Sequence, residues 1–183
     1  IYLDVDAGQN NEGFCILQTD ANEGFCIFVD DQGRLGIRLT NYSSTATLAS
    51  STVKTSNTVI PPQRWVHFAI ALNSDIINET VFRTAATRPK IMIDGTLKAT
   101  TATQVGSPSG LDPKAASASY AIGFGPAKDE TNAQVNLDGA LCDLALFQPN
   151  GDITESEMRA LYEASLNGAN NLGSGLMSTT PLS

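Results

Sequence analysis

The sequence predicts an all-β protein, an antiparallel β-sandwich with one short C-terminal helix near residues 154–166. Most apolar residues fall in short runs with the two-residue alternation of strands. Segments rich in Gly, Pro, Asn and Asp separate these runs, as turns do. The chain has 183 residues, which suits a single domain because all-β sandwiches run to about 200 residues.

The N-terminal quarter predicts a series of strands joined by turns. Residues 1–8, IYLDVDAG, alternate apolar and acidic side chains. The hexapeptide NEGFCI at 11–16 recurs at 22–27, and each copy is a turn followed by a β-rich run, so we expect two adjacent strands. Cys15 and Cys26 could then face each other across a hairpin, either as buried thiols or as a disulfide.

The next segments lead to the most apolar strand of the chain. A turn at 30–33 and a strand at 34–40 precede a Ser- and Thr-rich region, 41–57, which fits either exposed strands or a long loop. We expect a strand over 64–72, RWVHFAIAL, in which alternate residues share a face. Trp65 is interpreted as a packing residue, and His67 as a satisfied histidine of the sheet.

The second half predicts a hairpin, two loops and a further strand. Residues 90–98, KIMIDGTLK, carry the Asp94-Gly95 turn signal of a β-hairpin. We expect a surface loop over 99–118, a strand over 120–124 and an acidic loop over 125–132.

The stretch 135–166 predicts a central strand followed by a capped helix. From Ala140 to Phe147 both faces are largely apolar, which indicates a strand covered on both sides. Thr154 and Glu157 have the spacing of a capping box, and Ile153 and Met158 that of a hydrophobic staple. We expect the helix to lie against the sheet edge and to end near Gly168.

The order of these segments resembles a laminin-G-like, concanavalin A-like jelly-roll domain, the fold of many lectins and glucanases. Five features, spread mainly over 60–166, support the resemblance: Trp65-x-His67-x-Ala69, then Met92 with Asp94-Gly95, then Ile122-Gly123, then Gly139, Leu141, Asp143 and Leu144, and last Leu161-Tyr162. Cys142 replaces an acidic residue of the family pattern. The resemblance implies one domain over 1–166, with a flexible or partner-bound tail over 167–183.

The sequence does not predict an enzyme. The glucanases of this family use a Glu-x-Asp-x-x-Glu strand, and this motif is absent from the chain. The single histidine, His67, and the lack of a Gly-x-Ser-x-Gly elbow also argue against nucleophilic catalysis. No catalytic residue is assigned. Asp129, Glu130 and Asn132 offer three oxygen ligands within one loop and are a candidate calcium site; the alternative is a solvated acidic loop.

Charge and composition limit the classes of partner that the protein can be expected to bind. The net charge of −8 argues against nucleic acid, and the sequence lacks the run of about 20 apolar residues that a membrane-spanning helix needs. The chain begins with Ile1, so we expect further residues upstream. The leading hypothesis is a non-catalytic binding or adhesion module, extracellular or on a cell or virion surface, that recognises glycan or protein. The alternatives are a self-assembling virion, tail-fibre or decoration building block and a divergent glycoside hydrolase.

Overall fold

The computed structural model describes residues 1–3, 12–20, 23–42, 48–72, 82–105, 121–128, 134–135, 137, 139–145 and 152–166. All strand pairs among these residues are antiparallel, and a helix follows them, so the predicted all-β class is confirmed. The candidate calcium ligands Asp129, Glu130 and Asn132 and the tail over 167–183 lie outside the described residues. Within the described residues, no helix is long and apolar enough to cross a membrane.

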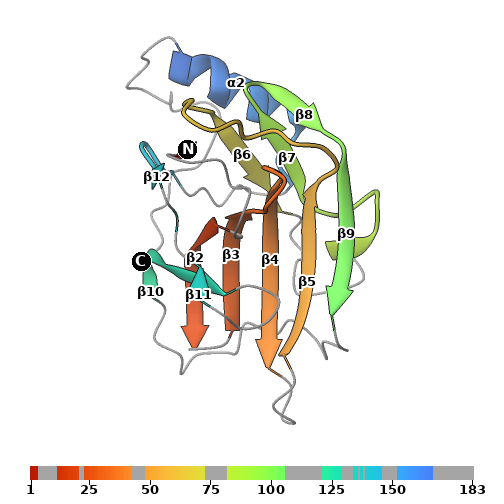
Figure 1. Ribbon diagram of the computed structural model, residues 1–183. Coiled ribbons are helices and arrows are strands. Elements are labelled where there is room, and N and C mark those ends of the chain that lie inside the picture. Colours follow the sequence, from red (N-terminus) through yellow and green to blue (C-terminus); the bar gives the residue numbers. More distant parts are fainter. Residues whose placement is uncertain are drawn as a thin grey trace.

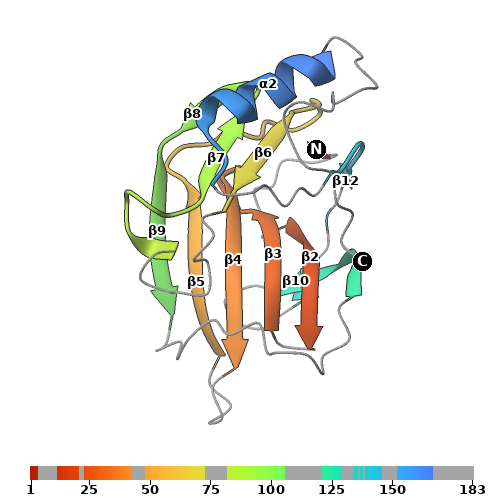
Figure 2. The same cartoon turned by 180° about the vertical axis from the view of Figure 1, so that it is seen from behind.

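The largest sheet has seven strands in the order β11-β10-β2-β3-β4-β5-β9 (Figures 1 and 2). These strands are β2 (Glu12–Asp20), β3 (Glu23–Val29), β4 (Leu35–Tyr42), β5 (Leu48–Thr55), β9 (Thr100–Val105), β10 (Ala121–Lys128) and β11 (Gln134–Val135). The repeated hexapeptide lies on the neighbouring strands β2 and β3, as predicted. Their register places the Cα atoms of Cys15 and Cys26 opposite each other.

Two polar segments that the sequence left open or assigned to loops belong to this sheet. The Ser- and Thr-rich region contributes the end of β4 and all of β5, and Ser51, Thr52 and Thr55 are buried. The prediction of a loop over 99–118 is wrong for 100–105, which forms the strand β9 beside β5. The loop predicted from residue 125 is wrong as far as Lys128, which ends β10. The β-branched Thr side chains of β5 and β9 favour strands, although they are polar.

A smaller sheet has three strands, β6 (Phe68–Ala71), β7 (Lys90–Ile93) and β8 (Thr96–Lys98). The predicted hairpin is present between β7 and β8. Asp94 and Gly95 both have positive φ angles, 47° and 73°, as a two-residue turn of the primed type requires. β6 is shorter than the predicted strand over 64–72, because pairing with β7 begins at Phe68.

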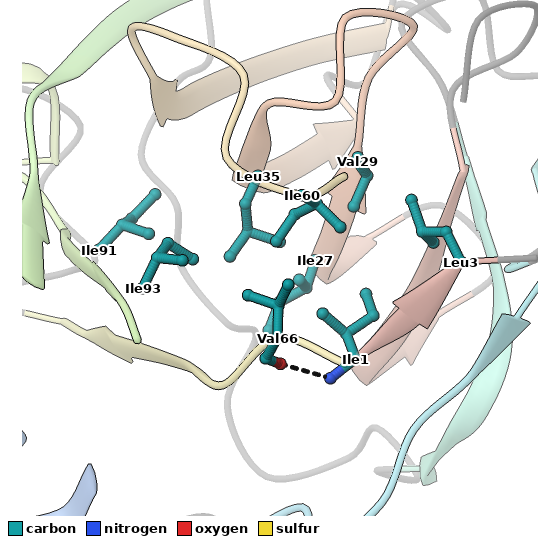
Figure 3. Packing of buried hydrophobic residues seen from close by; sticks show 9 residues of the cluster. All are labelled: Ile1, Leu3, Ile27, Val29, Leu35, Ile60, Val66, Ile91 and Ile93. Carbon is teal, nitrogen blue, oxygen red and sulfur yellow. Dashed lines mark hydrogen bonds between the residues drawn. The ribbon is translucent and has the colours of Figure 1, made fainter. Parts of the chain in front are cut away.

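Apolar side chains from both sheets meet in the main core cluster (Figure 3). Its buried members are Ile1, Leu3, Ile27, Val29, Leu35, Ile60, Val66, Ile91 and Ile93. β3 and β4 supply three of them from the larger sheet, and β7 supplies two from the smaller one. The chain start joins this core, since the Ile1 nitrogen donates to the Val66 carbonyl at 2.8 Å.

The helix α2 (Glu155–Leu166) begins with the predicted capping box. The Glu157 amide donates to Thr154 Oγ1 at 3.3 Å, and the Thr154 amide donates to Glu157 Oε2 at 2.6 Å. The staple is present as well, because Ile153 packs against the cluster that contains Met158. Met158 also contacts Met92 of the central strand β7. The helix therefore covers a face of the smaller sheet (Figure 1), and the prediction of docking at a sheet edge is wrong.

The central strand predicted over 140–147 is also wrong for the part that is described. Only Gly139–Ala140 forms a strand, β12, which pairs with β1 (Tyr2–Leu3). Residues 141–145 do not continue it, and Cys142 and Leu144 are exposed. Asp143 has a φ angle of 52°, which is incompatible with an extended strand. The apolar run reflects one inward residue, Leu141, which packs against the main core.

Candidate functional site

The outer face of the segment 65–71 is covered by helix α2 along most of its length. Val66 and the alternate residues Phe68 and Ile70 contribute to the main core. The opposite side chains are Trp65, His67, Ala69 and Ala71. Met158 of α2 packs with Ala71, and Ala69 adjoins the same cluster. The next residue toward the N-terminus, His67, lies against Tyr162 of α2, with ring centroids 5.1 Å apart.

Trp65 lies beyond the cover of the helix. The residue is 51% exposed. The other large hydrophobic residues that are exposed in the described part of the chain are leucines. We interpreted Trp65 from the sequence as a packing residue, and this interpretation is wrong. The alternation along the segment directs the indole away from the core, and about half of Trp65 stays open to solvent.

Tyr2 lies beside Trp65 because the chain start runs antiparallel to the segment 63–66. The Val66 amide donates to the Ile1 carbonyl at 2.9 Å, and the Gln63 amide donates to the Leu3 carbonyl at 2.8 Å. Ile1 and Leu3 are buried, so the alternation turns Tyr2 to the outer side. The Tyr2 and Trp65 ring centroids are 5.5 Å apart, with an angle of 42° between the ring planes.

Arg64, the residue before Trp65, adds a positive charge to this segment. Its Nη2 atom lies 2.9 Å from Asp94 Oδ2, and the side chains of Arg64 and Asp94 are 64% and 33% exposed. At this exposure the ion pair contributes little stability, about 0–1 kcal/mol, but it restrains the long side chain of Arg64. We call Tyr2, Arg64 and Trp65 together the aromatic ledge.

Asp94 is fixed by the hairpin turn and by the segment beneath it. Its Oδ1 atom accepts from the His67 amide at 3.0 Å. Its own amide donates to the His67 carbonyl, also at 3.0 Å. Asp94 thus holds the residue before β6 through two backbone hydrogen bonds while it pairs with Arg64. The turn that the sequence identified as a hairpin signal therefore also positions the charged part of the ledge.

His67 is half-buried between Asp94 and helix α2. Burial lowers the pKa of His67, and the Asp94 carboxylate opposes this change. We expected a histidine whose ring nitrogens have hydrogen-bond partners, and this expectation is wrong for one of the two nitrogens. His67 Nδ1 is buried and has no hydrogen-bond partner among the residues that the structure describes.

The ledge carries groups that can contact a ligand. Aromatic faces and an exposed guanidinium contact ligands through stacking and hydrogen bonds. In the described part of the chain, no group of three His, Cys, Asp or Glu side chains could hold a metal ion. Loss of solvation and the adjacent Asp143 carboxylate raise the pKa of the exposed Cys142 thiol, so this thiol is not an activated nucleophile.

Part of this site carries a signal in the sequence. His67, Asp94 and Tyr162, three residues that support the family resemblance, lie close together here, and Trp65 precedes His67 on the same segment. Tyr2 and Arg64 were missed. The alternation at 1–3 could have indicated that Tyr2 points opposite to Ile1 and Leu3, but its pairing with the segment 63–66 carries no local sequence signal.

In comparisons with known proteins, no family model, no curated protein and no solved structure matches the chain.

Proposed function

We propose that this protein is a non-catalytic binding module that recognises a glycan or a protein on a cell or virion surface through the aromatic ledge. The observation that carries the proposal is the exposed Trp65 beside Tyr2 and Arg64. Trp, Tyr and Arg are the residue types enriched at binding hot spots. Their clustering on one surface of an acidic chain favours a recognition site over a chance exposure.

We also propose that the sheets form a jelly-roll sandwich of the laminin-G-like, concanavalin A-like kind. The main core supports this proposal, because side chains of β3 and β4 meet those of β7 there. In such folds, ligands bind at loops and sheet rims, and the fold itself does not select the ligand. The ledge lies at a comparable place, where β1, β12 and the segment before β6 meet.

The test compares Trp65→Ala with Leu97→Ala on a glycan array and in binding to intact cells. Leu97 is a matched control because it is exposed to 37% and lies on β8, outside the ledge. The wild type and Leu97→Ala should bind the same ligand, and Trp65→Ala should lose at least about tenfold in affinity, as expected of a hot-spot truncation. Equal binding by all three proteins would reject the ledge as the binding site.

The array and the cells distinguish the two ligand classes. Signal on defined glycans identifies a sugar ligand, whereas cell binding that survives removal of surface glycans identifies a protein. A building block that assembles with copies of itself gives a different result. Light scattering would then show a stable oligomer that Trp65→Ala dissociates and Leu97→Ala does not. That outcome would replace the adhesion proposal.

A further inference from the structure

Asp94 connects the aromatic ledge to the half-buried imidazole of His67. One carboxylate oxygen, Oδ2, pairs with Arg64 of the ledge at 2.9 Å. The other, Oδ1, accepts the His67 amide at 3.0 Å. Each oxygen thus has a partner, and a movement of the carboxylate toward the His67 ring would disturb these two contacts.

The imidazole of His67 is poorly prepared to carry a second proton. Its Nδ1 atom is buried and has no partner among the described residues. A neutral imidazole can leave Nδ1 unprotonated, as an acceptor. The imidazolium needs acceptors for two N–H groups, and a buried donor without one is costly. Acidification therefore creates a demand for an acceptor at this position.

The groups around His67 indicate which acceptor responds. Tyr162 of α2 covers the ring, and the Ile1 nitrogen on the β1 side is a donor, bonded to the Val66 carbonyl. Arg64 on the neighbouring segment is a donor as well. Asp94, at the turn between β7 and β8, is the carboxylate whose charge favours the imidazolium. A charged His67 would attract the same carboxylate that now holds Arg64.

We propose that protonation of His67 draws Asp94 away from Arg64, so that acidification releases the charged part of the aromatic ledge. The consequence for ligand affinity rests on the binding function proposed above, whereas the release of Arg64 does not. The Arg64 side chain, already 64% exposed, then loses its restraint and pays more conformational entropy on binding. Ligand affinity is expected to fall as the pH decreases.

The pH range in which Arg64 is released follows from the direction in which the pKa of His67 is shifted. Burial lowers the pKa of His67 below the ordinary value of about 6.5, so the release occurs below that pH. The same shift means that the unfolded chain binds more protons than the folded chain in this range. Stability therefore increases with pH there and declines on acidification from about pH 6.5.

The first experiment needs no ligand. His67 is the single histidine of the chain, so one imidazole signal can be followed by NMR from pH 7.5 to 4.5 beside the Nε–H signal of Arg64. We expect both signals to move with the same midpoint, below pH 6.5. An Arg64 signal that stays constant while His67 titrates would overturn the proposal.

Two variants separate this coupling from a general effect of acid. In His67→Gln the Arg64 signal should show no transition between pH 5 and 7.5. In Asp94→Asn the midpoint of His67 should fall further, because the carboxylate that favours the imidazolium is gone. Circular dichroism at pH 7.5 confirms that each variant is folded, and the wild-type titration stands if one is not. An unchanged Arg64 transition in folded His67→Gln would contradict the proposal.

A binding experiment tests the effect of pH on ligand affinity, independently of the NMR titration. Affinity of the wild type for the glycan or protein found with the array or cells should decline between pH 7 and 5, and His67→Gln should lose most of this decline. If no ligand binds at any pH, the binding function fails while the NMR titration still decides on the coupling of His67, Asp94 and Arg64.

Discussion

The ring of Tyr162 lies directly against the backbone of Gly95. A Cβ atom added to Gly95 would come within 2.5 Å of Tyr162 Cδ1, closer than carbon atoms can approach. Gly95 also has a φ angle of 73°, in the left-handed region. The hairpin turn thus needs glycine twice, once for its own conformation and once for the docking of helix α2. This contact secures the C-terminal half of the helix above His67.

Gly95→Ala should therefore destabilise the protein for two separable reasons. The left-handed conformation alone costs a residue with a Cβ atom about 1–2 kcal/mol. The contact with Tyr162 adds a further cost, so the total should exceed this range in urea unfolding. The double variant Gly95→Ala/Tyr162→Ala removes the steric part. If the cost of Gly95→Ala is the same with and without the Tyr162 ring, the contact does not limit this site.

Local sequence signals predicted local structure well in this chain. The Asp94-Gly95 turn, the Thr154 capping box and the repeated hexapeptide on β2 and β3 each depend on residues close together in sequence. In each case backbone conformation or a short-range hydrogen bond selects the residue types. These features required no knowledge of distant partners.

The failures come from contacts between distant segments. The polar strand β9 was taken for a loop because its pairing depends on β5, about 50 residues earlier in the chain. The run after Ala140 was taken for a central strand, but its pairing ends at Ala140, and Asp143 then adopts a positive φ angle. The ledge was missed for the same reason, since Tyr2 and Trp65 meet only through pairing of 1–3 with 63–66.

Arg38 is a further residue that pattern analysis could not place. It lies on β4 between the core residues Ile37 and Leu39, so its side chain points to the opposite face of the sheet. An arginine on such a face is usually exposed to water. Arg38 is nevertheless only 2% exposed. Its guanidinium carbon lies 4.5 Å from the centroid of the Phe28 ring, and its Nε donates to Thr52 Oγ1 at 3.3 Å. Both faces of the sheet are thus shielded from solvent at this point.

Arg38→Ala should lose about 2–4 kcal/mol of stability, because a desolvated cation–π contact contributes about 2 kcal/mol and a buried hydrogen bond about 1 kcal/mol. Arg38→Met keeps the apolar volume and should lose clearly less. Chemical denaturation of Arg38→Ala, Phe28→Leu and the double variant measures the coupling of the pair, with Arg38→Met in the same series. A loss below about 0.5 kcal/mol for Arg38→Ala, typical of a surface substitution, would refute the structural role of this arginine.

Thr154→Ala should weaken helix α2 by about 1 kcal/mol, the usual cost of losing an N-cap side chain. The Thr154 hydroxyl accepts the Glu157 amide, and alanine leaves that amide without its partner. Ser165→Ala is the matched control at the other end of the helix, where the hydroxyl bonds to the Tyr162 carbonyl. Hydrogen exchange should accelerate in the first turn of α2 for Thr154→Ala alone. Equal exchange in both variants would show that the cap does not hold the helix start.

Asp30 should make the stability of the protein depend on pH in the acidic range. It is 2% exposed and precedes the turn between β3 and β4. Burial alone would raise its pKa, but hydrogen bonds from Arg34, Lys54 and the amide of Gln32 outweigh burial and hold the pKa below its usual range. The salt bridge to Arg34 measures 2.6 Å and that to Lys54 3.0 Å. The carboxylate thus joins the turn to β5.

The direction in which stability changes with pH follows from the lowered pKa of Asp30. Between the folded and unfolded pKa values, the unfolded chain binds more protons, so stability increases with pH in that window. The contribution is complete above about pH 4, near the ordinary value for aspartate, and is lost as the pH falls through the folded pKa. Asp30→Asn should therefore cost roughly 1.5–3 kcal/mol at pH 7, as for hydrogen bonds to a charged group, and much less at pH 3.

Urea unfolding of the wild type, Asp30→Asn and Asp31→Asn at several pH values checks this prediction. Asp31 is the matched control because it is the next residue and its side chain is exposed. The difference between wild type and Asp30→Asn should shrink as the pH falls below 4, while Asp31→Asn follows the wild type throughout. A difference that stays constant from pH 7 to 3 would mean that the shape of the side chain, and not its charge, stabilises the turn.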